Sequence, residues 1–238
     1  MFKVKCIHKL INYLWEFPCP LCDCDNHHDH NYNSFCADCL EELPLLHGVR
    51  CPGCGGELDG VLELCSDCLK MPPRPWHKAM AVMKMTGSAE KVIYRLKFSG
   101  SVVMARALAE LAVPLLSGPD FTDVDMIVPV PLHWRRYLER SYNQSGILAQ
   151  MLARQLNKPY KTPLKRIHPT IRQATLSKEE RLKNLRGAFA VPLPDKVAGR
   201  KILLVDDVLT TGATLHSCAE TLLQAGAASI KVFTVARR

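Results

Sequence analysis

The sequence predicts a small cysteine-rich domain followed by an α/β domain with a mostly parallel sheet. Three observations support this fold class. Ten of the 11 cysteines precede residue 75, the charge balance changes at the same point, and apolar strands alternate with amphipathic helices beyond it. Residues 1–75 carry 6 Lys/Arg against 11 Asp/Glu, whereas residues 76–238 carry 25 against 12. Because the prolines of "KMPPRPW" favour extended backbone and stop helices, this stretch marks the linker. The predicted domains are 18–75 and 76–238.

The segment before the first domain, residues 1–17, is interpreted as an amphipathic N-terminal helix with an apolar side. Such a helix either docks on its own protein or contacts a membrane surface, and both alternatives stay open. No apolar run approaches the about 20 residues of a membrane span, and the start lacks a small-residue cleavage site. We therefore expect a cytoplasmic protein, with peripheral contact at the inner face of the membrane as the alternative. The apolar side would carry Ile7, Leu10, Ile11 and Leu14.

Eight cysteines of the first domain form four C-x2-C pairs, and the pairs form an internal repeat. "C-P-x-C" opens each half of the repeat, and "C-x2-C-L" closes it. A two-residue gap lets both thiolates of a pair bind one tetrahedral ion, so two pairs complete a four-thiolate zinc site. Sequential pairing predicts two sites in a double zinc ribbon. Their ligands are Cys19, Cys22, Cys36 and Cys39 for the first site, and Cys51, Cys54, Cys65 and Cys68 for the second.

These zinc sites are expected to be structural. Four thiolates leave no open position for activating a water molecule, and so short a domain needs metal binding to fold. A disulfide framework is the alternative, which the expected reducing compartment disfavours. The segment "CDCDNHHDH" offers Cys24, His27, His28 and His30 as competing ligands or as a solvated loop.

The second domain alternates strands and helices. Residues 79–86 and 125–132 are typical of strands, whereas residues 88–98, 104–116 and 144–156 carry apolar side chains at helical spacing. A strand over 201–207, a helix over 212–226 that ends at a glycine, and a strand over 229–236 complete the domain. Ligands of such sheets bind beyond the carboxyl ends of the strands.

The stretch "KILLVDDVLTTGATL" (201–215) places two acids at the end of one strand. A P-loop ATPase would need G-x4-G-K-[ST], but no Gly-Lys pair occurs in the chain, and the G-x-G-x-x-G of a dinucleotide site is also missing. The remaining interpretation is a ribose 5-phosphate site. Ionised Asp206 and Asp207 would accept hydrogen bonds from ribose hydroxyls, while backbone amides from Thr210 to Thr214 and the start of the next helix would bind the phosphate.

At this point the chain resembles a known family. The string "VDDVLTTGAT" is similar to the phosphoribosyl pyrophosphate signature of type I phosphoribosyltransferases. Together with "VPVPLHWRRYLERSYNQS", "RQATLSKEERLKNLRGAF" and the paired cysteines, it makes nearly the whole chain resemble the ComF family. That resemblance implies a zinc ribbon joined to a phosphoribosyltransferase-type sheet, magnesium bound with phosphoribosyl pyrophosphate, and a role in DNA uptake during natural competence. It also implies that "PLHWRR" (131–136) stands in the place of the pyrophosphate loop.

Cations are needed near that loop, because pyrophosphate carries several negative charges. The same residues could instead belong to solvated basic surfaces. The segment 167–189 is interpreted either as a mobile flap that closes over the ligand or as a surface helix. The predicted ligand-binding residues are Asp206, Asp207, Thr210, Thr211, Gly212, Ala213, Thr214, His133, Trp134, Arg135 and Arg136, and the candidate catalytic residues are Lys97, Arg136, Arg172 and Arg186. Asn143 and Gln144 either reach the same site as neutral donors or begin the next helix.

Two functions of different classes follow. The first is a competence accessory protein that binds phosphoribosyl pyrophosphate or another 5-phosphate and works with single-stranded DNA and a DNA-translocating helicase. The second is an active phosphoribosyltransferase of nucleotide salvage or synthesis, whose acceptor no segment identifies. The basic second domain favours the first function, because phosphate contacts dominate nucleic-acid affinity.

Cys218, on the apolar face of the last helix, is expected in the core.

Overall fold

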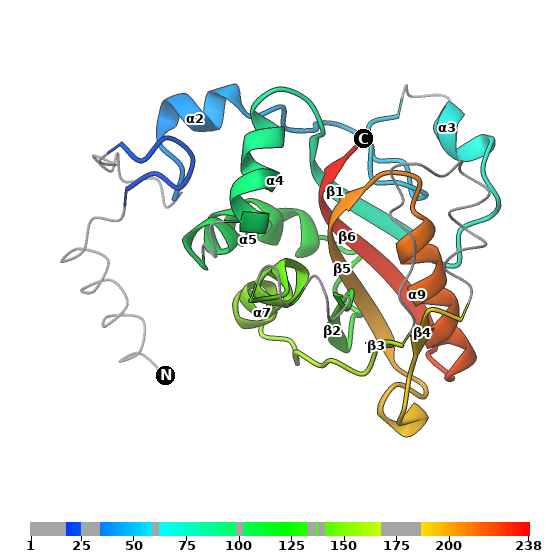
Figure 1. The fold of residues 1–238 in the computed structure, drawn as a ribbon. Coiled ribbons are helices and arrows are strands. Elements are labelled where there is room, and N and C mark those ends of the chain that lie inside the picture. Colours follow the sequence, from blue (N-terminus) through cyan, green and yellow to red (C-terminus); the bar gives the residue numbers. More distant parts are fainter. Residues whose placement is uncertain are drawn as a thin grey trace.

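The structure is a computed structural model, and its central element is a four-stranded parallel sheet (Figure 1). The strand order is β1-β6-β5-β2, and all three pairings are parallel. The predicted parallel sheet is therefore confirmed, and the carboxyl ends of its strands meet at one edge. The strands are β1 (Lys78–Lys84), β2 (Met126–Pro129), β5 (Lys201–Leu209) and β6 (Ser229–Arg237). The structure describes residues 18–24, 34–58, 62–98, 102–132, 137, 141–167 and 187–238.

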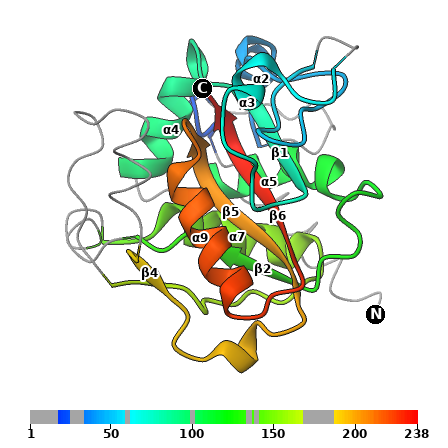
Figure 2. The same ribbon diagram turned by 90° about the vertical axis from the view of Figure 1, so that its right-hand side faces the viewer.

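Helices cover both faces of the sheet (Figures 1 and 2). The helices α4 (Ser88–Phe98), α5 (Val102–Leu116) and α7 (Gln144–Gln155) lie on one face, and α9 (Ala213–Gln224) lies over β5 and β6 on the other. Successive side chains of β5 pack on opposite faces of the sheet, because side chains along a strand alternate in direction. Leu203 and Val205 join the cluster with α4, α5 and α7, whereas Ile202 and Leu204 join the cluster with α9. Cys218 of α9 is fully buried in this second cluster, as predicted.

A second, two-stranded sheet frames the segment predicted to be a flap. β3 (Lys165–Arg166) pairs antiparallel with β4 (Phe189–Ala190), and Ile167 N donates to Ala188 O at 2.8 Å. A 3-10 helix, η2 (Pro194–Lys196), follows β4. The ladder brings the two ends of the segment together, but residues 168–186 lie outside the described residues.

The cysteine-rich part packs on the sheet from both sides. It contains the short helices α2 (Ala37–Glu42) and α3 (Ser66–Leu69). Side chains of the first cysteine repeat belong to the hydrophobic cluster under α4 and α5, and those of the second belong to the cluster under α9. Leu46 N also donates to Val82 O at 2.9 Å, and Lys84 N donates to Pro44 O at 2.9 Å, which covers the edge strand β1. The cysteine-rich part thus shares its core with the sheet.

The N-terminal segment 1–17, interpreted above as an amphipathic helix, lies outside the described residues. Among the helices that the structure does describe, none has the length and apolarity needed to cross a bilayer.

Candidate functional site

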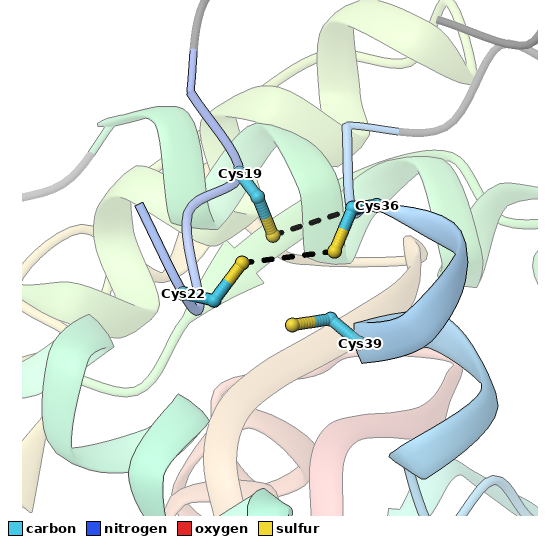
Figure 3. A group of neighbouring side chains, drawn as sticks. All are labelled: Cys19, Cys22, Cys36 and Cys39. Carbon is cyan, nitrogen blue, oxygen red and sulfur yellow. Dashed lines mark hydrogen bonds between the residues drawn. The ribbon is translucent and has the colours of Figure 1, made fainter. Parts of the chain in front are cut away.

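The eight paired cysteines gather into two clusters of four, with the sequential pairing that their spacing predicts. Within each cluster the four sulfur atoms lie within 4.8 Å of one another. Tetrahedral Zn–S bonds of about 2.3 Å put sulfur atoms about 3.8 Å apart, so both clusters could hold zinc. The first cluster comprises Cys19, Cys22, Cys36 and Cys39 (Figure 3), and the second comprises Cys51, Cys54, Cys65 and Cys68.

The internal repeat of the sequence is also a repeat of geometry. Cys36 and Cys65 are the N-caps of α2 and α3. Cys36 N donates to Cys19 Sγ at 3.4 Å, and Cys65 N donates to Cys51 Sγ at the same 3.4 Å. Backbone N–H groups aimed at sulfur stabilise thiolate, the form that binds metal. The two halves are therefore equivalent four-thiolate frames.

Cys24 lies beside the first cluster but outside its group of four. Its Sγ is 2.9 Å from Cys22 Sγ, and this contact lowers the pKa of Cys22 to about 6. His27, His28 and His30, the other competing ligands considered above, lie outside the described residues.

The acid pair lies near the carboxyl end of β5, where both carboxylates meet the start of α7. Ser145 Oγ donates to Asp206 Oδ1 at 2.8 Å, and Gln144 Nε2 approaches Asp207 Oδ2 at 3.4 Å. Lys97 of α4 forms an ion pair with Asp207, with 3.1 Å between Nζ and Oδ2. The acids are thus held from two helices on one face of the sheet.

Burial is the largest effect on Asp206. Desolvation and then the neighbouring Asp207 carboxylate raise the pKa of Asp206 to about 7. The expectation that both acids are ionised therefore holds for Asp206 only above about pH 7. Below that pH the Asp206 carboxyl can itself donate a hydrogen bond.

A short loop connects the acids to α9. Gly212 is the N-cap of α9 with φ of 78°, a left-handed conformation that favours glycine, and it has no side chain to cap the helix. Thr211 Oγ1 accepts a long hydrogen bond of 3.4 Å from Ala213 N, the first amide of α9. A Cβ at this position would lie 2.7 Å from Arg74 Nη1. The first amides of a helix have no intrahelical acceptor and carry its positive dipole, so the start of α9 is suited to an anion. We call residues 210–214 the phosphate loop.

The structure brings together part of the predicted site. The phosphate loop and both acids lie at one strand end, and Lys97 joins them by contacting an acid. Asn143 and Gln144 both lie at the start of α7, as one of the two expectations held. Gln144 also reaches Asp207, whereas Asn143 Nδ2 donates to the backbone carbonyl of Val130 at 3.0 Å. The remaining predicted residues, His133, Trp134, Arg135, Arg136, Arg172 and Arg186, lie outside the described residues.

The described residues include only the start of the predicted pyrophosphate loop, Pro131 and Leu132. They follow Val130, whose N–H donates to Val205 O, next to Asp206 in the chain, at 2.9 Å. Two residues near the site were not predicted from the sequence. Ser145 contacts Asp206, and Arg74 Nη1 donates to Thr211 O at 3.0 Å. The proline-flanked position of Arg74 in the linker was the available signal.

Comparison with known proteins agrees with this geometry. Residues 143–238 match the model of the phosphoribosyl transferase domain. The chain is 37% identical over 192 residues to DNA utilization protein YhgH of Escherichia coli (strain K12), covering 79% of this chain and 83% of that protein. It is 30% identical over 246 residues to competence protein ComFC of Bacillus subtilis (strain 168), covering 97% and 96%.

Solved structures are more distant. Glutamine phosphoribosylpyrophosphate amidotransferase from B. subtilis is 19% identical with a TM-score of 0.41, over 60% of this chain and 30% of that one. The family assignment depends instead on the sequence relatives, on the matched domain and on the paired cysteines. Relatives above 30% identity cover most of both chains, and the matched domain contains the acid pair and the phosphate loop. The chain therefore belongs to the ComF family, whose phosphoribosyltransferase-type domain it joins to two four-cysteine clusters.

Proposed function

We propose that this chain binds phosphoribosyl pyrophosphate together with Mg²⁺ at the carboxyl end of β5, and that this binding serves the handling of single-stranded DNA during DNA uptake. One observation carries the ligand part of the proposal. Two carboxylates and the N-terminus of α9 lie within a few residues of each other at one strand end, and among the described residues the only side-chain acceptor at this N-terminus is Thr211 Oγ1, 3.4 Å from Ala213 N. A ribose 5-phosphate complements this arrangement, because its vicinal hydroxyls can donate to the carboxylates while its phosphate lies at the helix N-terminus.

The acids would bind the ribose. Ionised Asp206 and Asp207 accept hydrogen bonds from the sugar hydroxyls, and Ser145 orients Asp206 for this task. Because the pKa of Asp206 is about 7, ligand binding through the ionised form strengthens as the pH rises through 7. Lys97 already lies against Asp207, where it supplies positive charge within reach of an incoming pyrophosphate group.

The phosphate loop would bind the 5-phosphate. Gly212 lets the backbone approach the anion closely, and the amides at the start of α9 would direct their partial positive charge toward it. The Ala213 amide would exchange its long contact with Thr211 Oγ1 for the phosphate. The hydroxyls of Thr210, Thr211 and Thr214 add further donors. Mg²⁺ would enter with the substrate and neutralise part of the charge of its diphosphate group.

The DNA part of the proposal depends on charge and on the relatives. Residues 76–238 carry 25 Lys/Arg against 12 Asp/Glu, an excess that suits contact with nucleic-acid phosphates. One relative is called a DNA utilization protein and another a competence protein. Single-stranded DNA and a DNA-translocating helicase are therefore the partners that we propose.

An active phosphoribosyltransferase is the second candidate. The β3–β4 ladder supports it, because it holds together the ends of the segment that carries Arg172 and Arg186. In the reaction a nucleophile would attack C1 of the ribose, the C1–O bond would break, and pyrophosphate would leave with the bonding electrons. A closing flap would exclude water from this step.

Two measurements on the full chain test the proposal. Calorimetric titration with phosphoribosyl pyrophosphate is expected to detect binding with Mg²⁺ and much weaker binding without it. A pyrophosphate-release assay over nucleobases and amines then separates the candidates, because binding without release supports the accessory role and release with one acceptor supports the transferase. No binding of phosphoribosyl pyrophosphate, with or without Mg²⁺, would contradict both.

A further inference from the structure

Three contacts connect the second cysteine cluster to the phosphate loop through the linker between the domains. Trp76 Nε1 donates to Gly53 O, between two ligands of the cluster, at 3.1 Å. The guanidinium carbon of Arg74 lies 5.2 Å from the centroid of the Trp76 ring, within cation–π distance. Arg74 Nη1 in turn donates to Thr211 O at 3.0 Å. We call this series of contacts the linker relay.

Each member of the linker relay is held firmly. Trp76 is 6% exposed and packs in the core cluster under α9, and its ring also meets the His216 ring edge-on at 6.5 Å between centroids. Prolines on both sides of Arg74 fix the backbone angles of the linker. Gly55, directly after Cys54 of the second cluster, could not carry a side chain, because a Cβ would lie 2.6 Å from the backbone of β1. The cluster, the linker and the sheet are therefore packed as one unit.

The contact at Thr211 controls the direction of an amide in the phosphate loop. Thr211 C=O and Gly212 N–H belong to one trans peptide unit, so they point in opposite directions. Holding the carbonyl against Arg74 therefore turns the Gly212 amide to the opposite side of the loop, away from the linker. The guanidinium also fills the space that a side chain at position 212 would need. Arg74 thus acts on the shape of the loop and adds a positive charge beside it.

The first cysteine cluster is fixed to a different part of the molecule. Arg95 of α4 forms a two-pronged ion pair with Asp23, with distances of 2.7 and 2.6 Å. Ser34 N and Oγ donate to Glu110 of α5 at 3.0 and 2.7 Å. These contacts attach the first cluster to α4 and α5, which lie on the opposite face of the sheet from α9. The two clusters therefore differ in what they position, although their internal geometry is the same.

We propose that metal binding by the second cluster sets the shape of the phosphate loop through Trp76 and Arg74, and that the first cluster has no such effect. Arg74 and Trp76 are positioning residues in this account. The effect on ligand affinity depends on the function proposed above, whereas the effect on the loop does not. Loss of metal from the second cluster would release Gly53, then Trp76, and finally the carbonyl of Thr211.

The experiment measures amide hydrogen exchange in residues 211–214 of the full chain by mass spectrometry, followed by calorimetric titration with phosphoribosyl pyrophosphate and Mg²⁺. The variants are Trp76→Phe, which removes the N–H but keeps a ring in the core, Arg74→Gln, and Cys65→Ser, which removes one ligand of the second cluster. Glu110→Ala, which detaches the first cluster from α5, is the matched control. Zinc content and thermal unfolding are measured for every variant.

We expect faster exchange in residues 211–214 for all three variants, and affinity about tenfold lower for Arg74→Gln, which is the value of one charge-assisted hydrogen bond. Glu110→Ala is expected to leave both quantities unchanged. Should Cys65→Ser fail to fold, Trp76→Phe with both clusters filled still decides the matter. Unchanged exchange in Trp76→Phe and Arg74→Gln would overturn the linker relay. If exchange changes but the parent protein binds no phosphoribosyl pyrophosphate, the relay stands and the proposed function fails.

Discussion

Replacing Asp206 by asparagine is expected to stabilise the protein at alkaline pH. In the folded protein, burial and the charge of Asp207 raise the pKa of Asp206 from 3.8 to about 7. The folded state therefore holds a proton that the unfolded state releases, and this contribution to stability is fully present below about pH 4 and is lost as the pH rises through 7. The difference in pKa corresponds to about 4 kcal/mol.

Asparagine removes the titration but keeps the main contacts. Asp206 accepts both Ser145 Oγ, at 2.8 Å, and Asp207 N, at 2.9 Å, through Oδ1, and an amide oxygen can accept the same two bonds. Between pH 5 and pH 8 the wild type should lose roughly 2–3 kcal/mol relative to Asp206→Asn. The variant should be the more stable protein at pH 8, although it would bind phosphoribosyl pyrophosphate less well.

Urea unfolding followed by circular dichroism at pH 5, 6, 7 and 8 measures this difference. Both proteins carry the same cysteine clusters, so the proton and metal equilibria of the thiolates cancel when the two unfolding free energies are subtracted. Asp195→Asn, in the exposed 3-10 helix η2, controls for the removal of one negative charge. A difference between wild type and Asp206→Asn that stays constant from pH 5 to pH 8 would refute the reasoning.

Three further predictions concern the metal, the loop and DNA. Elemental analysis of metal-replete protein should give two zinc ions per chain, and a value near one would mean that only one cluster binds metal. Gly212→Ala should destabilise the protein by about 1–2 kcal/mol and weaken phosphate binding, because alanine at φ of 78° is strained and its Cβ meets Arg74. Gly87→Ala, which has positive φ but nothing within 4 Å, is the control, and equal effects would show that the contact with Arg74 is unimportant. Binding of single-stranded DNA to the full chain should weaken with salt, with a logarithmic slope of about 0.7 per phosphate contact, and binding that ignores salt would argue against phosphate recognition.

Local sequence patterns predicted most of the fold. The helix expected over 88–98 has the bounds Ser88–Phe98 in the structure, because its apolar side chains recur at helical spacing and face the sheet. The strand expected over 201–207 instead continues to Leu209. Val208 and Leu209 still pair with Ala236 and Arg237. The two aspartates that precede them interrupt the apolar pattern, so the sequence indicated an earlier end of the strand.

The site was predicted in detail where its residues are close in the sequence, whereas Lys97 and Gln144 were candidates without an assigned partner. Cysteine spacing fixed the two clusters, and one continuous string contains both the acids and the phosphate loop. The ion pair of Lys97 with Asp207 and the contact of Arg74 with Thr211 join residues 110 and 137 positions apart. Such contacts depend on how helices and linker pack on the sheet, which no local pattern of hydrophobicity encodes. The same reason explains why the docking of each cysteine repeat on its own face of the sheet was not foreseen.

The central claim is that the acid pair of β5 binds the ribose of phosphoribosyl pyrophosphate. The most direct test is calorimetric titration with phosphoribosyl pyrophosphate and Mg²⁺. It compares the wild type with the double variant Asp206→Asn, Asp207→Asn at pH 8, where Asp206 is ionised. Each lost charge-assisted hydrogen bond is worth about 1.5–3 kcal/mol, so the double variant should bind at least about a hundredfold more weakly, with circular dichroism confirming that it is folded. Equal affinity of the two proteins would contradict the account.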